Sequence, residues 1–186
     1  GIRDAGTTSF WSRAIGAWGE TKGDIEGPGS RQWTGGLIGG LDRVFSSRLL
    51  AGVAVQYVET SVDYDVSPNK SQIRSGQLGA YASYGGAEAY VNGNISVIGT
   101  QAHANRFMNI GLLSYDVSSF ARSWALTASV EGGTIMEFDG YRFEPSLALN
   151  YAGAQPIDFE ERGGGGLSLI VHPDDSNSLR STLSAR

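Results

Sequence analysis

Residues 119–138 read SFARSWALTASVEGGTIMEF, and the size and polarity of their side chains alternate from one residue to the next. The even positions are mainly large and apolar, as at Trp124 and Leu126, whereas the odd positions are mainly small and polar, as at Thr127 and Ser129. A period of two residues indicates a β-strand, because successive side chains of a strand point to opposite faces of its sheet. The segment is therefore predicted to be a strand with one apolar face and one polar face.

The same period recurs along most of the chain. It is clear in residues 75–84, 90–97, 141–151, 167–172 and 179–186, and less regular in 10–21, 32–42 and 48–62. This gives about nine strands of roughly ten residues, the length that a tilted outer-membrane strand requires. The predicted fold is an all-β, antiparallel, up-and-down transmembrane β-barrel. Trp11 and Trp18 fall on opposite faces of the first strand, so its lipid side stays open.

The predicted connections alternate between long and short. The long ones are residues 22–31, 63–71, 102–118 and 155–165, and the short ones are 43–47, 85–88, 138–140 and 173–177. An outer-membrane meander has tight turns on the periplasmic side and longer loops outside. The first strand is then expected to start on the periplasmic side, and the ninth to run outward again.

Composition excludes several classes of protein. The chain has no cysteine, so a disulfide scaffold, a thiolate zinc site and a cysteine nucleophile are ruled out. A net charge of −5 with no basic cluster argues against a nucleic-acid partner. No apolar run approaches the ~18 residues that a transmembrane helix needs. Membrane crossing, if it occurs, must use strands.

The polar face of the alternating strands is predicted to line a wettable lumen. It carries both signs of charge, and opposite charges across a pore can pair or grip a passing polypeptide. The candidate lumen-lining residues are Gln77, Tyr81, Asn92, Asn94, Glu131, Arg142, Glu144, Asn150 and Arg180.

Aromatic residues gather near the predicted strand ends, while strand middles use Leu, Val, Ala and Gly. Trp and Tyr rings favour the headgroup level of a membrane, so two aromatic girdles are predicted. The alternative is that aromatic residues simply favour strands. The candidate girdle residues are Trp33, Tyr57, Tyr84, Trp124, Tyr141 and Tyr151.

No catalytic or metal site is predicted, and the chain is not expected to be an enzyme or to hold a cofactor. His103 and His172 lack a carboxylate or a second histidine at ligand spacing. No Gly-x-Ser-x-Gly motif occurs, and the glycine run 163–166 is not followed by the Lys-Ser/Thr of a phosphate loop. The acidic residues around 158–161 are expected to be solvated loop carboxylates.

Several segments, in order, resemble the C-terminal translocator domain of autotransporters. FWSRAIGAWGETKGD (10–24) is similar to that family's first barrel strand, and TGGLIGGLDRVFSSRLLAGVAVQYVETSVDYD (34–65) to its second and third. GQLGAYASYGG (76–86) resembles the fourth and FEPSLALNYAG (143–153) the seventh. FEERGGGGLSLIV (159–171) and SLRSTLSAR (178–186) resemble the eighth and ninth. One departure is Ser184, where glycine is expected.

The resemblance implies a type V secretion module, with about nine of an expected twelve strands present. Residues 1–9 would be a residual linker, and residues 10–186 a barrel that is incomplete at its C-terminus. Such a domain anchors in the Gram-negative outer membrane and helps to export an N-terminal passenger. The implied partners are outer-membrane lipid, the passenger segment and the barrel-assembly machinery. With strands missing, the isolated chain would expose two unpaired edges, which lipid does not tolerate.

Two other interpretations stay open. A different outer-membrane barrel, adhesin-type or porin-like, would share the alternation and the loop pattern. A soluble ligand-binding barrel would instead point apolar residues inward, and it is disfavoured because the polar face carries few lysines to cover a soluble surface.

Overall fold

The computed structural model describes residues 5–23, 29–65, 69–110 and 113–186. Apart from one 3₁₀ turn (η1, Gly165–Leu167), its regular structure is entirely strand. The strands are β1 (Thr8–Thr21), β2 (Ser30–Ser46), β3 (Leu49–Tyr64), β4 (Lys70–Gly85), β5 (Ala89–Ile110), β6 (Leu113–Thr134), β7 (Met136–Phe138), β8 (Tyr141–Phe143), β9 (Pro145–Ile157), β10 (Phe159–Glu160), β11 (Ile170–Val171) and β12 (Ser176–Ala185).

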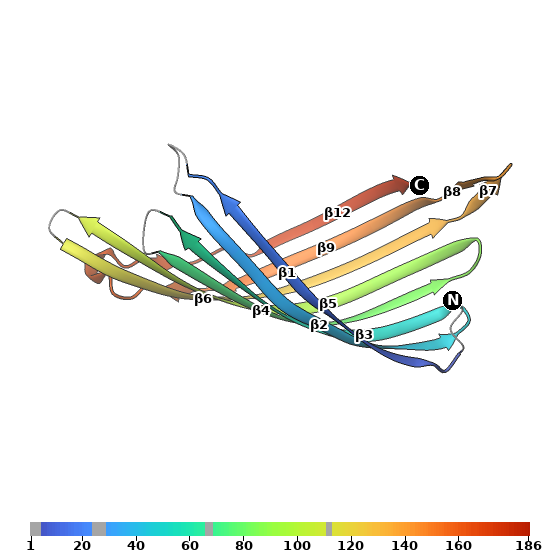
Figure 1. Ribbon diagram of the computed structural model, residues 1–186, viewed down its shortest axis with the longest axis horizontal. Helices are drawn as coiled ribbons and strands as arrows, with labels where there is room; N and C mark the ends of the chain where they lie inside the picture. The colour runs from blue at the N-terminus through green and yellow to red at the C-terminus, as the bar shows by residue number, and fades with distance from the viewer. Residues whose placement is uncertain (1–4, 24–28, 66–68, 111–112) are drawn as a thin grey trace.

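The main sheet has eight strands in the order β1-β2-β3-β4-β5-β6-β9-β12, each antiparallel to its neighbours. This confirms the antiparallel up-and-down meander. The sheet twists and curves into a trough, with β1 and β12 at its two edges (Figure 1). Within the described residues each of these two strands pairs with one neighbour, so the sheet is not closed.

The two ends of the trough differ. The short turns β2–β3 and β4–β5 lie at one end, on the right of Figure 1, and the β7–β8 hairpin projects from the same end. Asp139 (φ 52°) and Gly140 (φ 84°) form the turn of that hairpin. Two successive residues with positive φ suit a tight type I′ hairpin turn, for which Asp-Gly is a preferred pair.

The prediction of a long loop over residues 102–118 is wrong. Strands β5 and β6 pair without a break from Ala89↔Thr134 to Ile110↔Leu113, and their hairpin is the part of the sheet that extends furthest at the left of Figure 1. Residues 101–108 alternate weakly because each face mixes polar and apolar side chains. A search for period two therefore finds no signal in a strand that backbone pairing nevertheless maintains.

The predicted strand over 167–172 does not enter the main sheet, which therefore has eight strands and not nine. Gly163 (φ 95°) and Gly165 (φ 56°) turn the chain back, and the short strands β10 and β11 pair with each other. Strand β12 then pairs directly with β9, with Leu179 opposite Tyr151. It runs toward the short-turn end, opposite to the direction predicted for the last strand.

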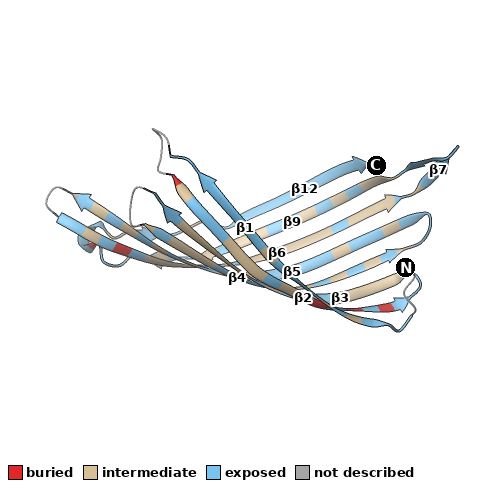
Figure 2. Cartoon of the chain, in the orientation of Figure 1, coloured by how far each residue is buried: buried red, intermediate tan, exposed pale blue. Residues whose placement is uncertain are grey.

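The sheet encloses almost no hydrophobic core. In the described part of the chain, Val44 and Val117 are the only buried hydrophobic residues. Burial alternates along the strands, so that one face is exposed and the other half-buried (Figure 2). Large apolar side chains populate the exposed face; Leu183, for example, is 82% exposed. This distribution contradicts the soluble-barrel alternative, which requires apolar residues to point inward.

A contact between β1 and β4 identifies the concave face. The indole N–H of Trp11 donates to the hydroxyl of Tyr81 at 3.0 Å, although β2 and β3 lie between them. Side chains separated by two intervening strands converge in this way only inside a curved sheet. The rings lie over glycines: a Cβ at Gly40 would be 2.6 Å from the Trp11 ring, and one at Gly52 2.6 Å from the Tyr81 ring. Trp18 falls on the convex face, which settles the orientation of β1.

We predict that Gly52→Ala destabilises the fold by about 1–3 kcal/mol, since the added methyl group would overlap both the Tyr81 ring and the carbonyl oxygen of Leu41. The free energy of unfolding in urea, followed by tryptophan fluorescence, measures the change. Gly76→Ala is the matched strand control, because a Cβ there has no atom within 4 Å. Equal effects of the two substitutions would contradict the proposed overlap.

Candidate lumen and the loop at its outer end

Hydroxyl and amide side chains form cross-strand ladders on the concave face. Gln77 donates its amide N–H to Ser96 Oγ at 2.8 Å, and Ser96 Oγ lies 2.7 Å from Thr127 Oγ1, so one ladder joins β4, β5 and β6. Ser75 and Thr100 make a second contact at 3.0 Å. Ser96 and Thr127, like Ser75 and Thr100, are directly opposed, whereas Gln77 reaches Ser96 diagonally. Cross-strand polar pairs of this kind stabilise a sheet. Among the described residues, no buried side-chain nitrogen or oxygen lacks a hydrogen-bond partner. The concave face is thus polar, and its described buried side-chain atoms are paired.

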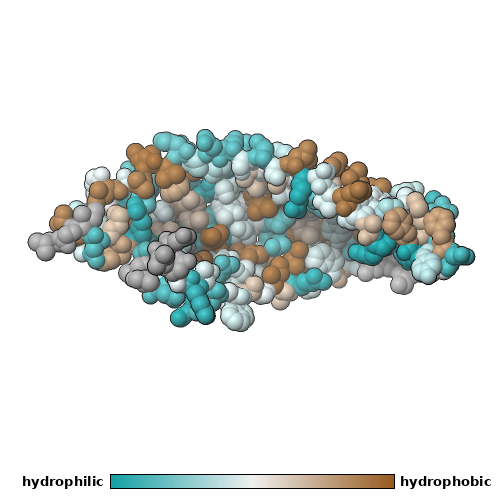
Figure 3. Space-filling view, turned by 90° about the horizontal axis from the view of Figure 1, so that it is seen from above, coloured by the Kyte–Doolittle hydropathy of each residue, from teal (hydrophilic) through white to brown (hydrophobic). Residues whose placement is uncertain are grey.

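Charged residues gather where the trough approaches its short-turn end. The hydroxyl of Tyr90 donates to Glu131 Oε1 at 2.8 Å, and Arg142 Nη2 lies 2.6 Å from Glu144 Oε1. Further along, the buried carboxylate of Asp42 accepts from the Tyr81 hydroxyl at 3.4 Å. Acidic groups on the concave face are therefore held by neighbouring donors. Figure 3 looks down on the hollow of the trough.

Register places most of the candidate lumen residues on the concave face. Asn94 opposes Tyr81 and Ser129, Ser129 opposes Asn150, and Asn150 opposes Arg180. Asn92 opposes Glu131 on the same face. Gln77 belongs to the ladder described above, and Glu144 precedes β9 on the concave side. Arg142 lies in β8, outside the main sheet, and reaches the others only through Glu144.

The candidate girdle residues are exposed, and those in the main sheet lie on the convex face. Trp33 directly opposes Trp18 across the β1–β2 pair. Tyr84 lies near the short turns and Tyr141 in the β7–β8 hairpin, whereas Trp33 lies toward the other end. Tyr57 lies at the middle of β3. Tyr151 stands at the centre of β9 instead of near its end, and its hydroxyl donates to Asn177 Oδ1 at 2.9 Å.

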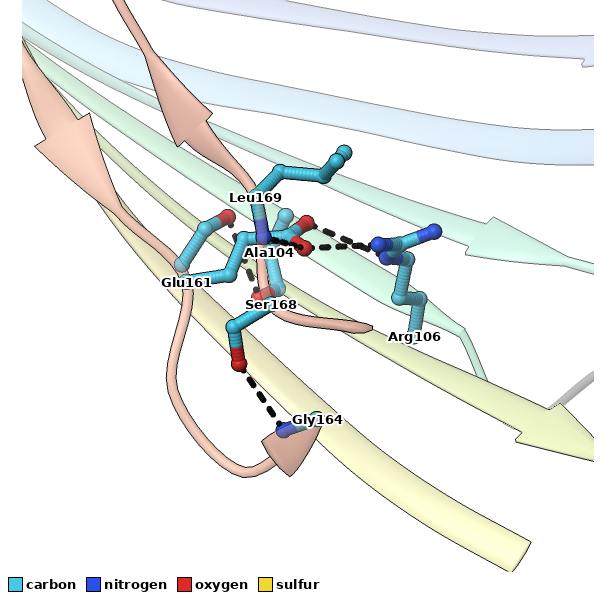
Figure 4. Close-up of polar contacts among 7 residues, drawn as sticks. Ala104, Arg106, Glu161, Gly164, Ser168 and Leu169 are labelled. Atoms are coloured by element: carbon cyan, nitrogen blue, oxygen red, sulfur yellow. Dashed lines mark hydrogen bonds and ion pairs between the residues drawn. The ribbon is translucent and has the colours of Figure 1, made fainter. Parts of the chain in front are cut away.

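The segment between β9 and β12 folds against the β5–β6 hairpin at the end of the trough opposite the short turns, which we call the outer end. Arg106 makes two hydrogen bonds to the Glu161 carboxylate, at 3.1 and 2.6 Å (Figure 4). The backbone N–H of Leu169 donates to the same carboxylate at 3.2 Å. Gly164 packs on Val117, which is only 2% exposed. A bidentate arginine–carboxylate pair is geometrically specific, and it fixes this segment over the concave side of β5 and β6.

The hydrogen bond from Arg106 lowers the pKa of the Glu161 carboxyl group below its ordinary value, assisted by the Leu169 amide and opposed by burial. The side chain of Glu161 is 10% exposed, so this pair is shielded from solvent far better than the surface pairs. A lowered pKa means that the ionised form stabilises the folded segment above the ordinary carboxyl pKa. That stabilisation is lost as the pH falls through the lowered value.

The structure brings together no group of three metal-binding side chains in the described residues. His103 lies in β5, not in a loop, with its ring 4.4 Å from the Phe120 ring. His172 Nδ1 lies 2.6 Å from Asp158 Oδ2. In the same described ranges, no helix is long and apolar enough to cross a membrane.

The chain matches a known protein family over nearly its whole length. The family model of the autotransporter β-domain matches residues 10–186. This chain belongs to the autotransporter β-domain family. Members of this family are outer-membrane barrels, so the predicted family and fold class are confirmed. No curated protein is similar to the chain in sequence.

Two solved structures share the fold. The translocator domain of the autotransporter NalP from Neisseria meningitidis aligns with a TM-score of 0.71 at 13% identity, covering 96% of this chain and 60% of that one. The β-domain of the Bordetella autotransporter BrkA aligns with a TM-score of 0.58 at 20% identity, covering 98% of this chain and 70% of that one. The chain thus spans 60% of the NalP domain's length.

Sequence reasoning missed two features of this site. Trp11 and Asp42 lie on the concave face beside Tyr81, and only curvature brings them there from other strands. The Arg106–Glu161 pair joins residues that sequence reasoning assigned to separate loops. The sequence shows that the two residues have opposite charges. It does not indicate which of the many charged loop residues form an ion pair with each other.

We predict that Glu161→Gln weakens the hydrogen-exchange protection of the Leu169 amide at neutral pH, because the neutral amide cannot accept a charge-assisted pair from Arg106. In the unaltered protein the same protection should be retained above the ordinary carboxyl pKa and lost at lower pH. Glu160→Gln, on the adjacent residue, is the control. Protection that is identical in all three proteins would refute the role of the ion pair.

Proposed function

We propose that this domain is the membrane-embedded translocator of a type V secretion protein, anchoring in the outer membrane and assisting export of an N-terminal passenger. The observation that carries the proposal is the reversed distribution of polarity in a family-matched meander: apolar side chains cover the convex face, and hydrogen-bonded polar ladders line the concave face. A lipid-facing wall around a wettable interior has this arrangement.

The polar concave face supports a conduit role. Its acids are engaged by Tyr and Arg donors, so a polypeptide passing along it would meet hydrogen-bonding groups instead of isolated charges. We propose Gln77, Tyr81, Asn94, Glu131 and Asn150 as lining residues. This role is positional and requires no bond-making step, so we propose that the domain is not an enzyme.

The proposed partners follow from the two faces. Outer-membrane lipid would contact the convex face, where Trp33, Tyr57, Tyr84 and Trp124 would mark the interfaces. The passenger segment would contact the concave face. The barrel-assembly machinery is proposed as the insertion partner because membrane strands need all their backbone groups paired before they enter lipid.

Single-cysteine labelling tests the membrane position. Because the chain has no native cysteine, only the introduced residue can react. With the protein in outer-membrane vesicles, we predict that Leu126→Cys resists a water-soluble maleimide, because its side chain faces lipid. Thr127→Cys, the next residue on the opposite face, should react. Equal reactivity of both positions would refute a lipid-facing wall.

Export is tested separately by surface display. A passenger carrying an epitope, placed ahead of residue 10 in the natural gene context, should become sensitive to external protease in intact cells. The control is the same fusion with Gly52→Ala, for which display should fall in proportion to the folded fraction. Labelling as predicted together with an inaccessible passenger would favour the alternative of an adhesin-type or porin-like barrel.

A further inference from the structure

The outward face of β6 changes from apolar to basic within one step. Going back along β6 toward the outer end, the residues on the convex face are Leu126, Trp124 and then Arg122. Two residues of strand span about 7 Å. Tryptophan rings favour the headgroup level. If the convex face meets lipid, as proposed above, the Arg122 guanidinium then stands at the depth of the lipid phosphates.

A cavity opens beside this arginine. Strand β9 separates from β6 after the Arg122↔Ile157 pair, and the chain returns to β6 at the Ser118↔Arg162 bridge. The chain bulges between these points, and the resulting open pocket has a volume of about 520 Å³. Its lining includes His103, Phe120, Arg122, Ile157, Phe159 and Arg162. The pocket therefore combines aromatic, aliphatic and cationic side chains at one site.

The two arginines, Arg122 and Arg162, form no ion pair within the part of the chain that the structure describes. The Arg122 guanidinium lies 4.6 Å from the centroid of the Phe120 ring. Two other cations at the same end of the trough are paired: Lys70 with Asp63, and Arg74 with Glu59. A planar guanidinium without a counterion is suited to two-pronged phosphate binding.

The acids in the pocket lie on the loop side. Asp158 is held by His172 at 2.6 Å, and Glu160 completes that wall. Carboxylates accept hydrogen bonds from hydroxyl groups but repel phosphate. The pocket thus offers cations for phosphate on one wall, acceptors for hydroxyl groups on the other, and aromatic rings between them.

We propose that this pocket binds the phosphorylated sugar headgroup of an outer-leaflet glycolipid, with Arg122 and Arg162 at the phosphate and Ile157 and Phe159 against the start of the acyl chains. The inference rests on the proposed membrane position of the domain. An ordinary glycerophospholipid would satisfy the arginines but leave the hydroxyl-accepting wall without a partner.

The test is native mass spectrometry of the folded protein in detergent micelles, titrated with a bisphosphorylated, acylated glucosamine disaccharide. We expect the double variant Arg122→Ala/Arg162→Ala to bind at least about tenfold more weakly. Arg122→Lys keeps the charge and the fold but loses the two-pronged geometry, so it should fall between. Arg74→Ala is the control, since Arg74 also points outward but is paired with Glu59.

Three results would overturn the proposal: equal affinity for phosphatidylglycerol, equal affinity for the dephosphorylated disaccharide lipid, or a loss in Arg74→Ala as large as in the double variant. Each would reduce the pocket to a general anionic or apolar surface. The labelling of Leu126→Cys and Thr127→Cys separates the two levels of inference. If labelling behaves as predicted but glycolipid affinity does not change, only the pocket assignment fails.

Discussion

Backbone hydrogen bonding between neighbouring strands is the constraint on which the remaining structure depends. From β1 to β6 the antiparallel register runs with one irregularity, between Val44 and Ser46. Because side chains alternate with period two, each register fixes which residues share a face. An unbroken ladder therefore sorts the whole chain into two surfaces without a hydrophobic core. The two surfaces then take opposite polarity, which is the reverse of a soluble barrel.

Curvature adds what register alone does not. Flat pairing would leave Trp11 and Tyr81 apart, separated by two strands, but the bend brings them into hydrogen-bond contact over Gly40 and Gly52. Because Gly40 and Gly52 have no side chain, the Trp11 and Tyr81 rings can lie over them. Small residues beneath large aromatic rings thus let the wall bend inward, and the same bend brings Asp42 within reach of the Tyr81 hydroxyl.

The sequence was sufficient for the fold class and for most face assignments, because a strand with one apolar and one polar face must alternate strictly. It failed where that demand is absent. Residues 102–110 and 113–118 continue as strand although their two faces hardly differ, so pairing alone maintains them. Residues 167–172 show alternation yet leave the sheet, since positive-φ glycines at 163 and 165 reverse the chain. Contacts between distant loops, such as Arg106 with Glu161, depend on that reversal and have no local signal.

The length of the β5–β6 hairpin has a consequence for what lies outside the cell. Each arm has 22 residues, about 70 Å of strand, whereas roughly ten residues cross the apolar layer. The rest extends mainly from the end opposite the short turns. In the proposed orientation this ribbon extends well above the membrane surface. The Arg106–Glu161 ion pair holds the segment between β9 and β12 against one side of it. Antibodies and bacteriophages approaching the cell would meet this ribbon before they reach the barrel wall.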